Sequence, residues 1–121
     1  MDEEKYRIAV ATSDGENIDL HFGRADSFDI YDADREGRVT FRERRENTPP
    51  CENGIHRDDR LLEAAETIRD CDFVLAARAG PGAQAALAQL GVDVYEIPGN
   101  VMDAIDRVLL FLEAQRIING G

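Results

Sequence analysis

The feature that most constrains the fold of this chain is the succession of strand-like and helix-like segments in its second half. Residues 73–77 (FVLAA) and 92–97 (VDVYEI) are short and rich in β-prone apolar side chains, which predicts two buried strands. Apolar residues at helical spacing predict a helix over residues 82–90 between these strands and another over residues 100–115 after them. Strands separated by helices favour parallel pairing in a sheet whose faces the helices cover.

The first half of the chain predicts a different arrangement, a meander of three strands. Residues 6–12 are apolar and β-prone, and residues 27–33 and 38–45 flank a hairpin turn at residues 34–37. A helix over residues 58–69 carries leucine, alanine and isoleucine on one face. The order β-β-β-α-β-α-β-α predicts an α/β fold, a mixed five-stranded sheet flanked by helices.

Length and charge limit the organisation and the partners of the chain. Its 121 residues predict a single domain, 1–121, with a core from about residue 6 to residue 112. The net charge of −11, from 25 acidic and 14 basic residues, opposes binding to nucleic acid or to anionic membranes. The densest basic stretch alternates with glutamates and favours a solvated strand edge; it contains Arg42, Arg44 and Arg45 beside Glu43 and Glu46.

Cysteine content and the start of the chain bear on its compartment. Two cysteines in a chain of this length do not form a disulfide framework, which favours a reducing cytoplasm. The acidic start MDEEKYRIAV is not typical of a signal peptide. Apolar runs remain well short of the roughly 20 residues that span a bilayer. We therefore expect a cytoplasmic protein.

The first candidate for chemistry is the segment His21-Phe22-Gly23-Arg24, which lies in a stretch without clear periodicity. Neutral imidazole is a good ligand for iron and related metals, so His21 is a candidate ligand. Gly23 allows close approach of the backbone to a ligand, and Arg24 could neutralise an anion. The alternative is a structural histidine that hydrogen-bonds the loop together, which is the commoner role of a lone histidine.

The second candidate lies in the irregular segment 46–57, where Cys51 and His56 stand five residues apart. A thiolate and an imidazole could reach one metal if this loop folds back, although the spacing is not that of a standard zinc site. The alternative is an exposed thiol and a surface histidine. Cys71, between a helix end and a buried strand, favours a core position. With so few soft donors, the monomer cannot build a closed four-thiolate site, and an under-ligated cargo suits transfer better than storage.

The third candidate is the turn Arg78-Ala-Gly80-Pro81-Gly82 between a strand and a helix. Backbone N–H groups at a helix N-terminus can bind an anion, and Gly80 and Gly82 are the residues we expect to approach it. The alternative is a tight βα turn, because the segment matches neither phosphate-loop pattern.

Carboxylates are abundant, among them Asp14, Asp19, Asp58 and Asp59. A metal-dependent hydrolase would need a pair of carboxylates singled out by position, and none is.

Several segments together resemble the nitrogenase iron–molybdenum-cofactor biosynthesis family, of the NifX, NafY and NifB C-terminal type. They are IAVATSDG at 8–15, HFGRADSFDIYD at 21–32, CDFVLAARAGPGA at 71–83 and GVDVYEIPG at 91–99. The resemblance implies a ribonuclease H-like architecture and non-covalent binding of iron–molybdenum cofactor or a related metal–sulfur cluster. It also implies that His21 is the functional histidine, and Cys51 falls where relatives often carry a cysteine.

We therefore predict a non-enzymatic carrier of an iron–molybdenum or related metal–sulfur cluster, or of its precursor. The binding residues would be His21, Phe22, Gly23, Arg24, Gly80 and Gly82, and the metal ligands His21, Cys51 and His56. Cluster donor and acceptor proteins would be its partners, and it could form a homo-oligomer. The alternatives are a cofactor-free interaction or regulatory domain and, by analogy of fold alone, a divalent-metal hydrolase.

Overall fold

The central element of the fold is a mixed five-stranded sheet in the order β4-β3-β1-β5-β6. The computed structural model describes residues 6–34, 36–47 and 58–120. The strands of the sheet are β1 (Tyr6–Ala11), β3 (Ser27–Ala33), β4 (Val39–Glu46), β5 (Phe73–Ala76) and β6 (Asp93–Glu96). Strands β4, β3 and β1 pair antiparallel, whereas β1, β5 and β6 pair parallel. The predicted meander, the parallel half and the mixed sheet are confirmed.

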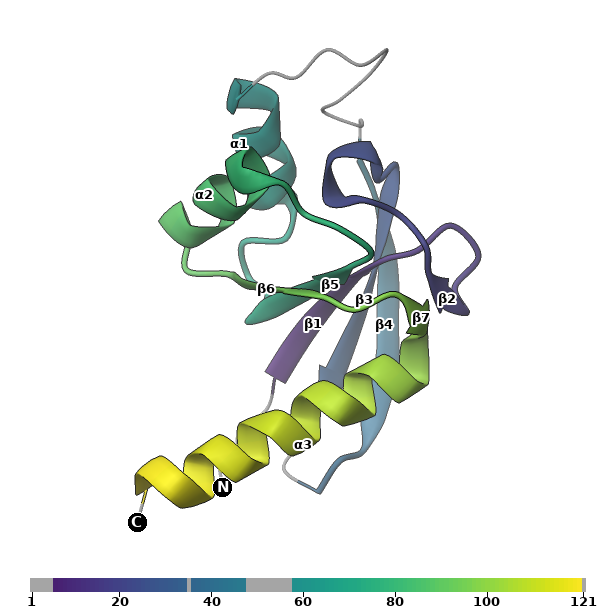
Figure 1. The fold of residues 1–121 in the computed structure, drawn as a ribbon. Coiled ribbons are helices and arrows are strands. Elements are labelled where there is room, and N and C mark those ends of the chain that lie inside the picture. The colour runs from purple at the N-terminus through teal and green to yellow at the C-terminus, as the bar shows by residue number, and fades with distance from the viewer. Residues whose placement is uncertain (1–5, 35, 48–57, 121) are drawn as a thin grey trace.

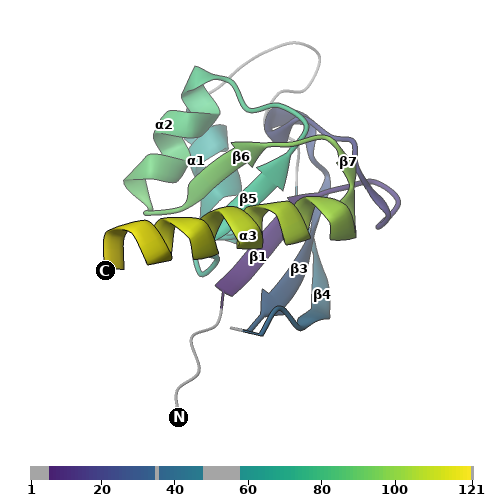
Figure 2. The same ribbon diagram turned by 60° about the horizontal axis from the view of Figure 1, so that its bottom comes forward.

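Helices cover both faces of this sheet, as Figure 1 and Figure 2 show from two directions. One face packs against α1 (Asp58–Thr67) and α2 (Pro81–Gln89), and the other against α3 (Val101–Gly120). Successive side chains of a strand point to opposite faces, so Ala9 faces α1 and α2 while Ile8 faces α3. All three predicted helices are confirmed, although α3 continues beyond residue 115 because residues 116–119 do not include proline or glycine.

Three short elements were not predicted because two or three residues carry no periodicity. They are β2 (Asn17–Ile18), the 3-10 helix η1 (Phe22–Arg24) and β7 (Gly99–Asn100). Strands β2 and β7 pair antiparallel, and the Val101 N–H donates to the Glu16 carbonyl at 2.9 Å. These contacts join the segment after β1 to the start of α3.

Local side-chain chemistry confirms two predicted boundaries. The Asn100 side chain accepts a hydrogen bond from the Asp103 N–H at 2.9 Å, so it caps α3 at the start of the predicted helix. In the β3–β4 hairpin, the Asp34 carboxylate accepts hydrogen bonds from the N–H groups of Glu36 and Arg38, and Gly37 adopts a φ of 86°. That left-handed conformation favours glycine.

The route of the chain marks one edge of the sheet for ligand binding. The carboxyl ends of the parallel strands β1, β5 and β6 meet at the same edge. There the chain leaves β5 toward α2 on one face and leaves β6 toward α3 on the other (Figure 1). The strand order reverses at β1, which lies between β3 and β5, and ligands in open α/β sheets bind in the crevice outside the carboxyl ends of the strands at such a reversal. Over the described part of the chain, α1, α2 and α3 are each too short or too polar to cross a membrane.

Candidate binding site at the carboxyl edge of the sheet

The structure brings together two of the three candidate segments. His21 forms an isolated parallel bridge with Arg78, although the two residues are far apart in the sequence. The Phe22 N–H donates to the Arg78 carbonyl at 2.8 Å, and the Ala77 N–H donates to the Leu20 carbonyl at 2.9 Å. The His-Phe-Gly segment and the Gly-Pro-Gly turn therefore form one surface beside the carboxyl end of β5.

Buried anchors hold the His21 segment in place. The Phe22 side chain is fully buried and packs against Phe28, with ring centroids 5.5 Å apart. On the N-terminal side, the Asp19 carboxylate accepts hydrogen bonds from the N–H and the hydroxyl of Ser13. The side chain of Phe22 thus points into the core, and any contribution it makes to binding is to fix the loop that carries His21.

The His21 side chain itself is exposed. Within residues 6–34, 36–47 and 58–120, its imidazole has no hydrogen-bond partner, whereas its carbonyl accepts from the Arg24 N–H at 2.9 Å. The alternative of a histidine that hydrogen-bonds the loop together therefore finds no support among the contacts of this side chain. No described residue occupies either ring nitrogen.

The Gly80 turn leaves open space at the N-terminus of α2. Gly80 is the N-cap residue with φ −72° and ψ 176°, a conformation open to any residue, and Pro81 begins the helix. A Cβ atom added to Gly80 would meet nothing within 4 Å. Among the described residues, neither the backbone conformation nor the packing requires glycine there, and the lack of a side chain leaves the turn open.

Two side chains from other elements fix Ala79, next to Gly80. Its N–H donates to Oε2 of Glu96 at 2.9 Å, and its carbonyl accepts from Nε2 of Gln84 at 2.9 Å. Glu96 ends β6 and Gln84 lies in the first turn of α2. The sequence did not single out either residue, because a glutamate at a strand end and a glutamine in a helix have no distinctive pattern.

The arginines at this edge differ from the arginines of β4. Arg24 and Arg78 are both exposed, and neither forms an ion pair with any residue that the structure describes. In a chain of net charge −11, where carboxylates outnumber basic groups, unpaired arginines are available to an anionic ligand. This arrangement is compatible with the predicted role of Arg24 and adds Arg78 to the candidate residues.

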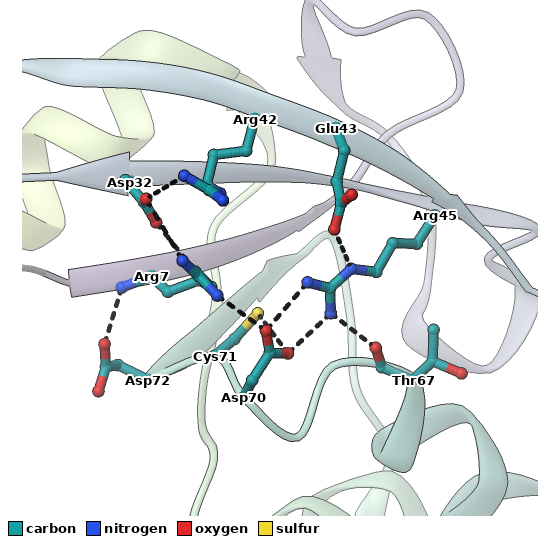
Figure 3. Close-up of polar contacts among 9 residues, drawn as sticks. All are labelled: Arg7, Asp32, Arg42, Glu43, Arg45, Thr67, Asp70, Cys71 and Asp72. Atoms are coloured by element: carbon teal, nitrogen blue, oxygen red, sulfur yellow. Dashed lines mark hydrogen bonds and ion pairs between the residues drawn. The ribbon is translucent and has the colours of Figure 1, made fainter.

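The predicted solvated strand edge is an ion-paired network (Figure 3). Arg42 pairs with Asp32 at 3.1 Å. Arg44, which the figure does not draw, pairs with Asp29 at 2.7 Å. Arg45 pairs with Asp70 at 2.7 Å and also donates to the Thr67 carbonyl at the end of α1. These three arginines are therefore neutralised by carboxylates of the same chain.

Of the remaining soft donors, Cys51 and His56 lie outside the described residues. Cys71 is a buried core residue, as expected, and burial together with the nearby Asp70 carboxylate raises the pKa of its thiol to about 12. In the parts of the chain that the structure describes, three or more histidine, cysteine, aspartate or glutamate side chains do not come together to hold a metal ion. His21 is thus not part of a group of three or more such donors among the described residues.

The aspartates near this edge shape the backbone. Asp14 accepts hydrogen bonds from the N–H groups of Glu16 and Asn17, and these lower the pKa of its carboxyl group to about 2. Asp19 is bound to Ser13 as described above. Asp14 and Asp19 therefore stabilise the loop after β1 by accepting hydrogen bonds from it, which is a structural use of these carboxylates.

The family model for the dinitrogenase iron-molybdenum cofactor matches residues 4–110. The chain belongs to this family. Relatives include the FeMo cofactor biosynthesis protein NifB of Chlorobaculum tepidum, 35% identical over 104 residues, which cover 86% of this chain and 24% of that protein. Protein NifX of Rhodobacter capsulatus is 27% identical over 92 residues, covering 74% of this chain and 58% of that protein. The chain thus spans about a quarter of the NifB relative.

Two solved structures have a similar fold. The crystal structure of PH0822 matches with a TM-score of 0.62 and 25% identity, over 85% of this chain and 89% of that one. The NMR structure of a putative NifB protein from Thermotoga, TM1290, matches with a TM-score of 0.57 and 28% identity, over 84% of each chain. The resemblance inferred from the motifs is confirmed.

Proposed function

We propose that this protein is a carrier that binds an iron–molybdenum cofactor, or a related metal–sulfur cluster or precursor, and passes it on during cofactor biosynthesis. One observation carries the proposal: the backbone of His21 is bridged to Arg78, two residues before the open Gly80 turn, and the exposed imidazole of His21 has no partner among the described residues. The family of the chain and its similarity to NifB and NifX support the choice of cargo.

The chemistry of the surface fits a negatively charged metal–sulfur cluster. Imidazole is a ligand for iron and similar metals, so His21 would supply one bond to the cargo. The guanidinium groups of Arg24 and Arg78 and the N–H groups at the start of α2 would offset its charge. A cargo held by few protein ligands can be displaced by an acceptor, which suits a carrier.

The proposal also includes ligands, partners and a compartment that the described surface does not contain. Cys51 and His56 would add ligands from the segment between β4 and α1, and cluster donor and acceptor proteins would be the partners in a cytoplasmic pathway. The role is that of a binding protein, not an enzyme. The antiparallel β4-β3-β1 half joined to the parallel β5-β6 half supports a ribonuclease H-like architecture.

The proposal is tested by loading the protein with iron–molybdenum cofactor isolated from nitrogenase, under anaerobic conditions. We expect brown protein that retains iron and molybdenum through gel filtration, and much less of both metals on a His21→Ala variant. Arg107→Ala, an exposed arginine on α3 with no ion pair among the described residues, is the matched control and should load normally. Equal retention by all three proteins, or none by the parent chain, would contradict the proposal and favour a cofactor-free interaction domain.

A further inference from the structure

The carboxylate of Glu96 lies at the proposed binding edge without a cationic partner. Its Oε2 accepts the Ala79 N–H at 2.9 Å, and it forms no ion pair with any residue that the structure describes. Glu96 is exposed, and it stands opposite Ala76 where the parallel strands β5 and β6 end. A carboxylate therefore lies against the turn beside which we place an anionic cargo.

The position of this carboxylate is determined by the turn it binds. Ala79 lies between Arg78, which is bridged to His21, and Gly80, the open N-cap of α2. Because Glu96 holds the N–H and Gln84 holds the carbonyl of Ala79, the backbone between the His21 bridge and the helix start is fixed from both sides. Loss of either contact would let this backbone rotate and would move Gly80 relative to His21.

The same side chain has an opposing electrostatic effect. An uncompensated carboxylate near an anion raises the free energy of the bound state, and screening by salt reduces the effect when the groups are exposed. Neutral hydrogen-bond acceptors, such as a glutamine carbonyl, could hold the Ala79 N–H without this repulsion. A glutamate at this position therefore holds the turn by a hydrogen bond and, through its charge, lowers the affinity for an anionic cargo.

We propose that Glu96 is a positioning residue of the carrier site that fixes the Ala79 turn and whose negative charge at the same time weakens the hold on anionic cargo and favours its release. The inference rests on the proposed carrier function. It separates two roles of one side chain, a hydrogen bond that the site needs for its shape and a charge that limits how long the cargo stays.

The test uses tetrathiomolybdate, an inorganic molybdenum–sulfur dianion, as the probe, and measures its dissociation from the full chain at low ionic strength. Glu96→Gln keeps an acceptor for Ala79 but removes the charge, so dissociation should be about 3- to 10-fold slower than from the parent chain. The difference should shrink in concentrated salt. Asp93→Asn removes the same charge from the other end of β6, where the exposed side chain has no partner among the described residues, and should change the rate less than about twofold.

The hydrogen-bond role is tested separately, without any probe, by amide hydrogen exchange at Ala79. Glu96→Ala should accelerate this exchange, whereas Glu96→Gln should leave it near that of the parent chain. A Glu96→Gln protein that releases the probe as fast as Asp93→Asn would overturn the charge role, and an unchanged exchange rate in Glu96→Ala would overturn the positioning role. If the parent chain binds neither tetrathiomolybdate nor isolated iron–molybdenum cofactor, the carrier function itself fails.

Discussion

Two groups of arginines in this protein are used in opposite ways. In the network of Figure 3, Arg7 connects Asp32 and Asp70, and Arg45 binds Asp70 through two nitrogens at 2.7 and 2.9 Å. These pairs link β1, β3 and β4 to the segment between α1 and β5. Around His21, by contrast, Arg24 and Arg78 have no acidic partner among the described residues.

The difference lies in what holds each region together. At the network, ion pairs reinforce strands that already pair through their backbones and link them to the segment before β5. At the His21 edge, the elements are connected by backbone hydrogen bonds, by the buried ring of Phe22 and by the Glu96 carboxylate, and the arginines form no ion pair with a described residue. A region whose apolar and backbone contacts already define its shape can leave its polar groups to a ligand. Replacing the buried Phe22, the ion-paired Asp70 and the exposed His21 in turn tests this difference between the two regions.

The largest effect on stability should come from Phe22→Ala. The ring is fully buried against Phe28, and removing a buried phenylalanine typically costs about 3–5 kcal/mol of unfolding free energy. Phe41→Ala is the matched control, because its ring is 53% exposed on β4, and it should cost about 1 kcal/mol or less. Chemical denaturation measures both. Similar losses would mean that Phe22 does not anchor the site.

A smaller loss is expected from Asp70→Asn, which removes the shared acceptor of Arg7 and Arg45. The Asp70 side chain is 42% exposed, so solvent screening limits the loss to about 1–2 kcal/mol despite the paired geometry. Asp93→Asn, with an exposed side chain and no described partner, should be nearly neutral. If Asp70→Asn and Asp93→Asn unfolded at the same denaturant concentration, the ion pairs of Asp70 would not stabilise the protein.

The same variant gives the pH dependence of the network. The hydrogen bonds and charges of Arg45 and Arg7 hold the pKa of the Asp70 carboxyl group well below its usual range. A carboxyl group with a lowered pKa in the folded state stabilises the protein above its unfolded pKa of about 4, and the contribution is lost as the pH falls further. The stability difference between parent and Asp70→Asn should therefore be constant near neutral pH and shrink below about pH 4, as measured by denaturation across that range.

At the other region, His21→Ala should change binding and not stability. The exposed imidazole has no hydrogen-bond partner among the described residues, so unfolding free energy should change by less than about 0.5 kcal/mol. Loss of a metal ligand should lower the retention of isolated iron–molybdenum cofactor by about tenfold or more. A sharp fall in melting temperature with unchanged retention would instead identify His21 as a structural residue and remove the contrast between the two regions.

The elements of the fold could be predicted because their signals are local. The apolar runs of β1 and β5 and the turn residues of the β3–β4 hairpin can be read in short windows of sequence. The two-residue strands β2 and β7 could not be predicted, because their pairing depends on segments that only the folded chain brings together.

The site shows the same limit. The sequence identified His21 and the Gly80 turn as separate candidates, but their proximity depends on the bridge between His21 and Arg78, a non-local backbone contact. The free charge of Arg78 and the contact of Glu96 with Ala79 depend on which neighbours each side chain finds in space. Residue type alone does not distinguish Arg78 from the paired Arg45.

The smallest expected effect concerns Cys51, which the structure does not describe. If Cys51 adds a soft ligand to a cargo already held at His21, Cys51→Ser should speed transfer to a chelator or acceptor about 3-fold and should change the amount of loaded cargo less.

The control variant for this prediction is Cys71→Ser. Its thiol is buried and has a raised pKa, so it is a poor ligand, and the substitution should lower stability without changing the transfer rate of the folded protein. The measurement is the rate of metal release to a chelator from each loaded protein. Equal rates for Cys51→Ser and the parent would mean that Cys51 is only a thiol on the chain between β4 and α1, and that His21 and the neighbouring cationic groups hold the cargo without it.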